Sequence, residues 1–590
     1  MKSVVLDLIG SHFLDKAVSL LKRNATLRGT GDNWDIRILV GQMRSFNQNK
    51  DLHLFASNII VNRVDFRHLP NDKPKNNIKD LPRSKFSLNI DEWKKYISTS
   101  KVIIGRIFIE FFKEFKFLEK CLPVHIKHKY SKEMSQKSTI ISMPIINVNE
   151  SSYNDCVHIL RTYESWIGEI YQNAGLLPDI PAKDDPNIPM GAANKSQLYS
   201  HRNHTPGDIM KDMKICFAGD QLTRVRFAGA KDIMAASSTP IDRLEHCSPF
   251  KGAMFHTLAS FVQYNYHLLF DAESVNQIGT LKYFREKYNR KNCTPSKVLD
   301  SYEGSEELLI NMGKAYIVVA ALDFFGMKNL DDKPTIHAFP PNLVHKSVEE
   351  KRIYFDEVLQ EFIDKYILQK GVNDADDHVK NYALCSIFLT LLVLQMKDTA
   401  KEADGERNLI NQKLLLTIFK SLGAYSKYAI EMFISIAQVE SLLTPQLAEQ
   451  FKWSYFVNWK GGEGNNMEED KAQEITNKLS KNMVQRMGPN KTINSISKIC
   501  KATTGIKESI ENIDTELGIH KTSTKHTKQE SKADEIEMIR EIQLLKPFTY
   551  TPGRYHASFP DIKRSPMLYL NIVEFHKWLD RHKSEVTLVV

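Results

Sequence analysis

The spacing of apolar residues changes once along this chain, and that change limits the folds open to it. Two β-type runs, LRGTGDNWDIRILV and DLHLFASNIIVNRVDF, occur near the start, and a third, DMKICFAGD, follows a helical segment at 151–175. From about Asp300 to Leu447 nearly every segment carries the 3.6-residue period of a helix. Strands first and helices later, with one helix before a central strand, predict an α/β layer with a large helical insertion.

The chain has 590 residues, which is long enough for more than one hydrophobic core. The Lys-rich stretch His520–Glu535 is typical of a solvated linker or mobile strap. The patterns divide the chain into a first piece of the core (1–70), a loop and helical insertion (71–150), a second piece of the core with the central strand (151–260), a helical insertion (261–422), late helices that close the core (423–500), a polar linker (501–540) and a basic C-terminal tail (541–590).

Composition restricts the function classes only mildly. The chain carries 80 Lys and Arg against 71 Asp and Glu, and the resulting net charge of +9 permits contact with nucleic acid without demanding it. Seven cysteines without a CxxC pair argue against a zinc ribbon or a disulfide scaffold and indicate a reducing compartment. The longest apolar stretch, Ala383–Met396, is shorter than the ~20 residues of a membrane span. We therefore expect a core helix there, no membrane partner, and a nuclear or else cytoplasmic location.

Two aspartates share one sequence context. Asp32 in GTGDN and Asp220 in FAGDQ each follow a glycine, precede an amide residue, and lie where a β-type run meets a loop. A sheet can bring such strand ends together although the residues are far apart in the chain. Paired carboxylates at strand ends are what divalent-metal phosphoryl chemistry requires, because Mg²⁺ and Mn²⁺ take oxygen ligands.

A third acid from a later helix usually completes such a site, and we favour Glu431. It lies in the apolar helical segment KYAIEMFISIAQ, where a buried carboxylate needs a partner such as a metal. Glu406, Asp470 and Glu474 are the rivals in sequence.

Plainer interpretations stay open at these positions. A Gly-Asp pair at a strand end is often a turn or the cap of a following helix, and a helical glutamate often faces solvent. His256 in AMFHTLASF is more typical of a core histidine with satisfied hydrogen bonds than of a metal ligand. No GxxxxGK[ST], HExxH or GxSxG motif occurs, and GTGDNW lacks the last glycine of a dinucleotide fingerprint. These absences remove many enzyme classes and leave metal-dependent phosphoryl chemistry or no chemistry.

Six blocks in a fixed order connect the chain to a known family. They are GDNWDIRI…MRSFNQNKDLHLF, GDQLT…RFAGAK, PIDRLEHCSPF…AMFHT, KYAIEMFISIAQ, FVNWKGGEGNN and YTPGRYHASFP, and they span roughly Leu27 to Lys577. Together they resemble the domain of unknown function 6589 family, whose members look like relatives of cut-and-paste DNA transposases with a ribonuclease-H-like core.

This resemblance implies a fold and a site. In such transposases the first acid ends the first strand, the second ends the fourth, and the third lies on a late helix after a helical insertion. Asp32, Asp220 and Glu431 would then be the catalytic metal ligands. The resemblance also implies that three cations face nucleic-acid phosphate: Arg224, Arg226 and Lys231. The fold class implied is α/β, with a ribonuclease-H-like mixed sheet, a large all-helical insertion at Asp300–Leu422 and a helical C-terminal region.

The resulting expectation is a transposase-derived protein that uses Mg²⁺ or Mn²⁺ to cleave DNA phosphodiesters and transfer strands, with DNA and other copies of the chain as partners. One alternative is a host-adopted nuclear scaffold that keeps the fold, binds DNA or protein, and has lost the chemistry. Another is a helical protein-interaction module in which the strand-end aspartates are only turns.

Overall fold

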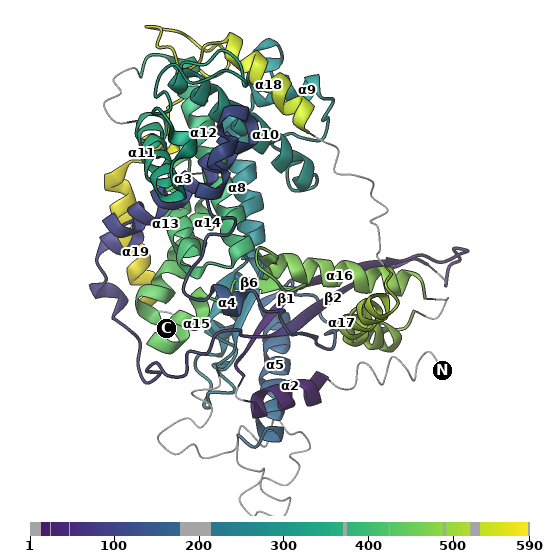
Figure 1. Cartoon of the computed structure of the whole chain (residues 1–590). Coiled ribbons are helices and arrows are strands. Elements are labelled where there is room, and N and C mark those ends of the chain that lie inside the picture. Colours follow the sequence, from purple (N-terminus) through teal and green to yellow (C-terminus); the bar gives the residue numbers. More distant parts are fainter. Residues whose placement is uncertain are drawn as a thin grey trace, which may run out of the picture.

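The computed structural model describes residues 13–23, 25–46, 48–176, 214–369, 375–423, 425–487, 491–519 and 531–587. Figure 1 shows a sheet with helices on both of its faces, next to a larger body of helices. The chain therefore has the mixed α/β architecture that the sequence predicts, with most of its helices outside the sheet layer.

The sheet has five strands in the order β3-β2-β1-β4-β5. β1 pairs antiparallel with β2, and β2 pairs antiparallel with β3. β4 runs parallel to β1, and β5 runs parallel to β4. The bounds are Leu27–Ile38 for β1, Lys50–Val61 for β2, Ile140–Ser142 for β3, Cys216–Gly219 for β4 and Phe250–Gly252 for β5. A separate antiparallel pair joins β6 (Phe456–Asn458) to β7 (Asn466–Glu468).

Helices cover the sheet and build the second part of the molecule. The bounds of the α-helices are α2 Phe13–Lys22, α3 Ile90–Phe111, α4 Ser131–Met134, α5 Tyr153–Asn173, α7 Gln221–Met234, α8 Met254–Leu269, α9 Leu281–Lys287, α10 Tyr302–Phe325, α11 Val348–Tyr366, α12 His378–Glu402, α13 Gly405–Ser421, α14 Ser426–Ala437, α15 Pro445–Lys452, α16 Glu469–Gln485, α17 Ile493–Glu516, α18 Lys532–Leu544 and α19 Ile572–Thr587.

The alternation of residues along β1 separates the two faces of the sheet. Phe55 and Phe217 pack with α2, α5 and α7 on one face, and Trp34 packs with α16 and α17 on the other. The glycines of the GTG motif admit the rings on the first face, because a Cβ at Gly29 would lie 2.2 Å from Phe217 and one at Gly31 would lie 2.6 Å from Phe55. The even-numbered residues of β1 consequently face α16.

A buried ion-pair network fixes the start of α16 on the sheet. Oε2 of Glu469 lies 2.9 Å from Nε of Arg28 on β1, and Oε1 lies 2.6 Å from Nζ of Lys251 on β5. All three side chains are almost fully buried. One turn later Gln473 accepts a hydrogen bond from Asn58 of β2 at 2.5 Å. These contacts determine which face of α16 lies over β1.

The helical body has its own large core. α10 and α12 lie inside it, and the apolar stretch Ala383–Met396 forms the middle of α12, in agreement with the expected core helix. By length and composition alone both helices could cross a membrane, but 83% of the relevant window of each is buried inside the protein. Burial of this extent is what a core helix shows, so the two helices are weak evidence for a membrane span.

Three segments differ from the predicted elements or cannot be compared with them. Ile140–Ser142 lies in the expected loop and helical insertion but forms β3, and three residues are too few for an alternating pattern to be visible. The expected linker at 501–540 is partly helical, because Ile496, Ile499 and Cys500 bring α17 against the sheet face that carries Trp34. Most of His520–Glu535 lies outside the described residues.

Candidate functional site

The structure brings Asp32 and Asp220 to the same place on the sheet. Thr30 of β1 is the register partner of Ala218 in β4, and the two strands are parallel. Two residues further along each strand direction are Asp32 and Asp220. Asp220 directly follows β4, as predicted, but Asp32 lies inside β1, because the strand continues to Ile38 in its pairing with β2, so its predicted place at a strand end is wrong. Neighbouring strands lie about 4.8 Å apart, so the two backbones run level with each other here. Both aspartates are half-buried.

Asp32 lies among other charged groups. Its Oδ1 accepts a hydrogen bond from the backbone N–H of Asn33 at 2.8 Å, and Oδ2 accepts one from Asn477 of α16 at 3.3 Å. Burial raises the pKa of Asp32 to about 6; His256 lowers it, and the carboxylates of Asp220 and Glu474 raise it. The raised pKa reflects an unfavourable environment for negative charge, of the kind that a bound cation would relieve.

Asp220 also serves as the N-cap of α7. Its Oδ1 accepts a hydrogen bond from the backbone N–H of Thr223 at 2.6 Å. The plainer interpretation of this residue as a helix cap is therefore realised in the structure. A cap occupies one oxygen, and a carboxylate has two, so this role is compatible with metal ligation through Oδ2.

Glu431 lies near Asp220 but is engaged by a cation. Its Oε2 lies 2.5 Å from Nε of Arg224, and its side chain is only 3% exposed. A Cβ at Gly252 of β5 would lie 2.9 Å from the same oxygen, which places the carboxylate against the sheet. Burial raises the pKa of Glu431, although Arg224 opposes this effect. In the structure, an arginine is therefore the partner of this buried carboxylate.

Glu474 of α16 also lies near Asp32. Its side chain is 42% exposed, and its Oε1 lies 3.2 Å from Nε2 of His256. It lies three positions before Asn477, so the two side chains are neighbours on α16: Asn477 contacts Asp32 of β1, and Glu474 contacts His256 of α8. The effect of Glu474 on the pKa of Asp32 shows that their charges interact.

His256 connects α8 to two acids of α16. Nδ1 lies 3.0 Å from Oδ2 of Asp470, which also accepts hydrogen bonds from the backbone N–H groups of Phe255 and His256. Burial alone lowers the pKa of His256, but Asp470 and Glu474 outweigh it and raise the pKa to about 11. The histidine is therefore a paired imidazolium, in keeping with its interpretation as a histidine whose bonds are satisfied.

Sequence reasoning missed Glu150. This fully buried residue accepts hydrogen bonds from Asn33 at 2.9 Å and from the Thr223 hydroxyl at 2.8 Å. Asn33 follows Asp32, and Thr223 is the residue capped by Asp220, so Glu150 ties the two aspartate segments together. Burial raises the pKa of Glu150 to about 7, against the effect of the Thr223 hydrogen bond. Its sequence context, a single acid in NVNESS before a helix, carries no signal of this role.

The three cations expected at phosphate lie largely inside the protein. Arg224 pairs with Glu431, and Nη1 of Arg226 lies 3.3 Å from Oε1 of Glu150. Burial lowers the pKa of Lys231, whose Nζ lies 6.0 Å from the centre of the Phe250 ring. In this arrangement Arg224 and Arg226 neutralise buried carboxylates, and their contact with phosphate stays a prediction.

Among the described residues, no group of three or more His, Cys, Asp and Glu side chains is arranged to hold a metal ion. The donor types nevertheless suit Mg²⁺ or Mn²⁺, because Asp32, Asp220 and Glu474 supply only oxygen. The burial of the Asp32 carboxylate, with the charges of Asp220 and Glu474 nearby, is also compatible with a bound cation. Binding would use Oε2 of Glu474, since Oε1 lies on His256, and would require Asp32 to exchange its contact with Asn477 for the ion. The remaining rival, Glu406, lies in the helical body, where it pairs with Lys95 at 2.5 Å.

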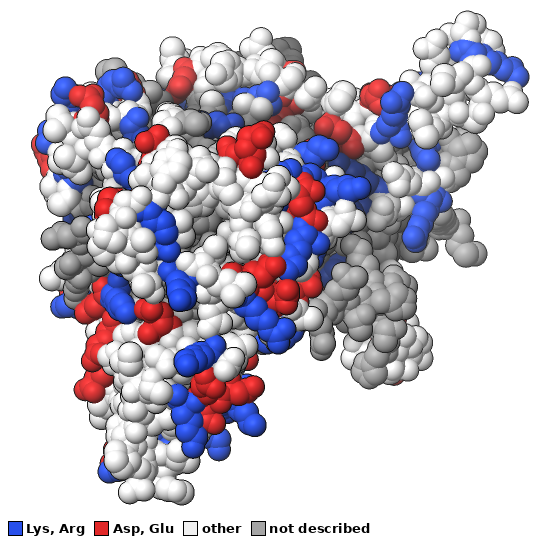
Figure 2. Space-filling model, turned by 90° about the horizontal axis from the view of Figure 1, so that it is seen from above, with Lys and Arg blue, Asp and Glu red and all other residues white. Residues whose placement is uncertain are grey.

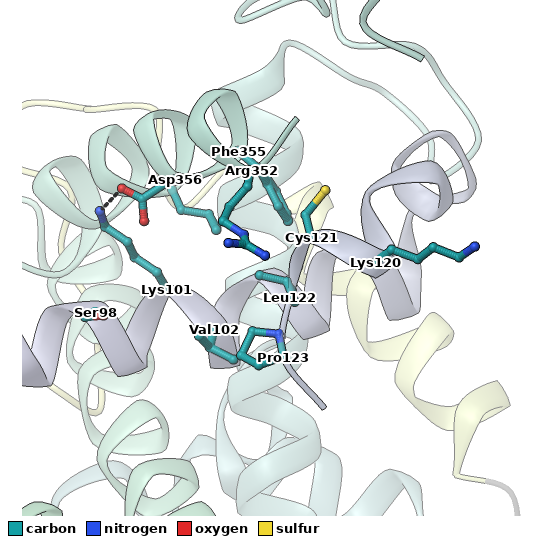
Figure 3. A pocket seen from close by; sticks show the side chains of 11 residues that line it. Ser98, Lys101, Val102, Lys120, Cys121, Leu122, Pro123, Arg352, Phe355 and Asp356 are labelled. Atoms are coloured by element: carbon teal, nitrogen blue, oxygen red, sulfur yellow. Dashed lines mark hydrogen bonds and ion pairs between the residues drawn. The ribbon is translucent and has the colours of Figure 1, made fainter. Parts of the chain in front are cut away.

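A cavity of about 410 Å³ lies away from these acids, between α3 and α11 (Figure 3). Arg352 extends into it, and Lys101 turns aside to an ion pair of 2.7 Å with Asp356. The residues predicted from the sequence as a site do not line this cavity.

The fold and site define a mixed α/β protein with a cluster of acids on and beside its central parallel strands. The chain matches the model of a family described as "Family of unknown function (DUF6589)" over residues 74–526, and it belongs to that family. Asp220, Glu431 and Glu474 lie within the matched range, whereas Asp32 precedes it. No curated protein and no solved structure matches the chain.

Proposed function

We propose that this chain is a transposase-derived protein with a ribonuclease-H-like core that cleaves DNA phosphodiesters with the help of Mg²⁺ or Mn²⁺. The observation that carries the proposal is that the register of the parallel strands β1 and β4 brings Asp32 and Asp220 side by side. In the transposases that the chain resembles, the first acid ends the first strand and the second ends the fourth. Asp220 directly follows β4, in support of that order, whereas Asp32 lies inside β1 and not at its end.

Of the late helical acids, Glu474 suits the third position better than Glu431. A metal ligand that also meets DNA must be open to solvent, and the exposed fractions are 42% for Glu474 and 3% for Glu431. Glu431 is also neutralised by Arg224. We therefore assign the third acid to Glu474 and a structural ion pair to Glu431.

The residues of the chain have separate tasks in this mechanism. The metal would be held by Asp32, Asp220 and Glu474. His256 would orient Glu474 through the ion pair between them. The chemistry that a divalent ion would supply there is activation of water, or of a 3′-hydroxyl, for attack on the phosphodiester and stabilisation of charge on the phosphate. With a pKa of about 6, Asp32 is mostly ionised at neutral pH and becomes protonated below that value, which would weaken metal binding.

The test is nicking of supercoiled plasmid DNA with Mn²⁺, together with Mn²⁺ binding followed by calorimetry. The wild-type chain should bind the ion and nick, and Asp220→Asn should lose both, with a rate at least ~100-fold lower. Asp300→Asn, which removes an exposed carboxylate elsewhere, serves as the matched control. Equal nicking by wild type and Asp220→Asn, or none by either, would count against cleavage.

A second candidate is a nuclear scaffold that binds DNA or protein without cutting. It is favoured by the partners that the acids already have: Asn477 for Asp32, Thr223 for Asp220 and His256 for Glu474. Such an arrangement can stand without metal. The two candidates separate in the calorimetry, because only the first expects Mn²⁺ binding that Asp220→Asn abolishes.

A further inference from the structure

The hairpin formed by β1 and β2 extends beyond the rest of the sheet. β1 continues for eight residues past Thr30, its last partner in β4, while β2 pairs with it along its whole length. Figure 1 shows the two strands passing beneath α16 and projecting from the body of the molecule. The same strand thus carries Asp32 near its middle and the hairpin tip at its end.

The tip combines exposed cations with exposed apolar side chains. Between Ile36 and Lys50 the sequence contains Arg37, Arg44 and Lys50 and has no acidic residue. Three large apolar side chains here are strongly exposed, at 69% for Leu39, 70% for Met43 and 83% for Phe46. In the view of Figure 2 the lobe that projects at the right carries Lys and Arg at its end among uncharged residues.

We propose that this tip binds the backbone and bases of DNA at a distance from the acid site, an inference that rests on the proposed function. A strand rises about 3.4 Å per residue, so Ile38 lies roughly 20 Å from Asp32 and the loop beyond it lies further. One turn of B-DNA is about 34 Å. A duplex at the acids would therefore meet the tip about one helical turn away, with the cations on phosphates and Phe46 against bases.

The chemistry of the tip favours nucleic acid over another copy of the chain. Arg44 and Lys50 are exposed cations that complement a phosphate backbone, and Arg37 forms a solvent-exposed pair of 3.7 Å with Asp51, which contributes little and can be exchanged for phosphate. An exposed aromatic such as Phe46 can insert against the bases of a duplex. The interface of a stable dimer needs about 20–30 residues a side. Residues 39–46 and 48–49 are too few to supply it, and their apolar side chains alternate with glycine, glutamine, serine and arginine.

The test measures binding of the full chain to a labelled duplex of ~40 base pairs by fluorescence anisotropy, over a range of about 50 to 200 mM salt. The hairpin variant R37A/R44A/K50A should bind more weakly, and the slope of log K against log[salt] should become shallower by about 2–3. Phe46→Ala should weaken binding without changing the slope. The matched control is K113A/K116A/K328A, which removes three exposed cations from the helical body and should leave the slope unchanged.

The outcomes separate this inference from the proposed function. If wild type binds DNA and the hairpin variant behaves like the control, the tip is not the contact, and the proposed function is untouched. If wild type binds no duplex, both are wrong. A hairpin variant that changes only the sedimentation coefficient would identify the tip as an interface between copies, which also overturns the inference.

Discussion

Nε2 of His256 lies 3.2 Å from Oε1 of Glu474, and the ring thereby joins the start of α8 to the exposed face of α16. The other ring nitrogen is held by Asp470, so the imidazolium cannot turn away from Glu474 without losing a second ion pair. The acid we assign as the third metal ligand is consequently positioned by a charged group, and several consequences can be measured.

His256→Gln should weaken Mn²⁺ binding by about 10–100-fold, because second-sphere partners of metal ligands contribute on that scale.

The pairing of His256 should also make stability depend on pH. The pKa of His256, about 11, lies above the ordinary 6.5, so the folded chain binds this proton more tightly than the unfolded chain does. The stability that this pairing contributes is full below pH ~6.5 and is lost as the pH rises through about 11. Chemical denaturation at several pH values measures it. His345→Gln, at an exposed position, is the control, and equal behaviour of the two variants would contradict the role of His256.

Asp32→Asn should stabilise the metal-free chain at pH 7.5 by about 1–3 kcal/mol. The pKa of Asp32, about 6, lies above the ordinary 3.8, so its charged form is disfavoured in the folded state. The resulting loss of stability in wild type is absent below pH ~4 and complete above pH ~6, so the difference in stability between variant and wild type should vanish near pH 4. Thermal unfolding in EDTA tests this. A variant that is less stable than wild type at pH 7.5 would show that burial does not disfavour the charged form of Asp32 in the folded chain.

Glu474→Gln and Glu431→Gln should have opposite signatures. The first should abolish Mn²⁺ binding and lower the free energy of unfolding only slightly, because its side chain is 42% exposed and Asp470 still pairs with His256. The second should reduce the free energy of unfolding by about 1–3 kcal/mol, since Arg224 loses its buried charged partner, while Mn²⁺ still binds. Calorimetry and urea denaturation on the same samples decide between them. If Glu431→Gln instead abolished Mn²⁺ binding and Glu474→Gln retained it, Glu431 would be the third metal ligand.

Glu469→Ala should be among the most damaging single changes, with a loss of about 3–5 kcal/mol in the free energy of unfolding. It leaves Arg28 and Lys251 buried without their shared carboxylate. Glu516→Ala, at the exposed end of α17, is the matched control, and urea denaturation gives both values. Similar midpoints for the two variants would mean that α16 is held by its apolar contacts alone.

Glu150→Ala should weaken Mn²⁺ binding about 10–100-fold by freeing Asn33 and Thr223, whereas Glu150→Gln should retain most of it. Glutamine keeps a carbonyl acceptor for these donors and loses only the charge. Calorimetric titration of both variants distinguishes a bridge that sets the spacing of the two aspartates from a ligand that contacts the ion. Equal losses in the two variants would favour direct ligation by Glu150.

Local signals in the sequence predicted many elements correctly. The alternating runs around Asp32 gave the β1–β2 pair, and Ser152 caps α5 through the backbone N–H of Asp155, with Gly175 in a left-handed conformation after its end. Such signals act between residues a few positions apart. β3 and β5 were missed because each has only three residues, and their strand character depends on pairing with distant segments.

The sequence by itself determined where most helices and the longer strands form, that two Gly-Asp pairs follow β-type residues, and that charge permits contact with nucleic acid. Only the tertiary structure decided which late acid stands beside Asp32, because Glu431 and Glu474 both lie on helices and differ in what packs against them. The buried pairing of Glu469 with Arg28 and Lys251 fixes α16 on the sheet, His256 holds Glu474 beside the acid site, and Arg224 neutralises Glu431. Contacts between residues hundreds of positions apart depend on the register and packing of the whole chain, which local patterns do not encode.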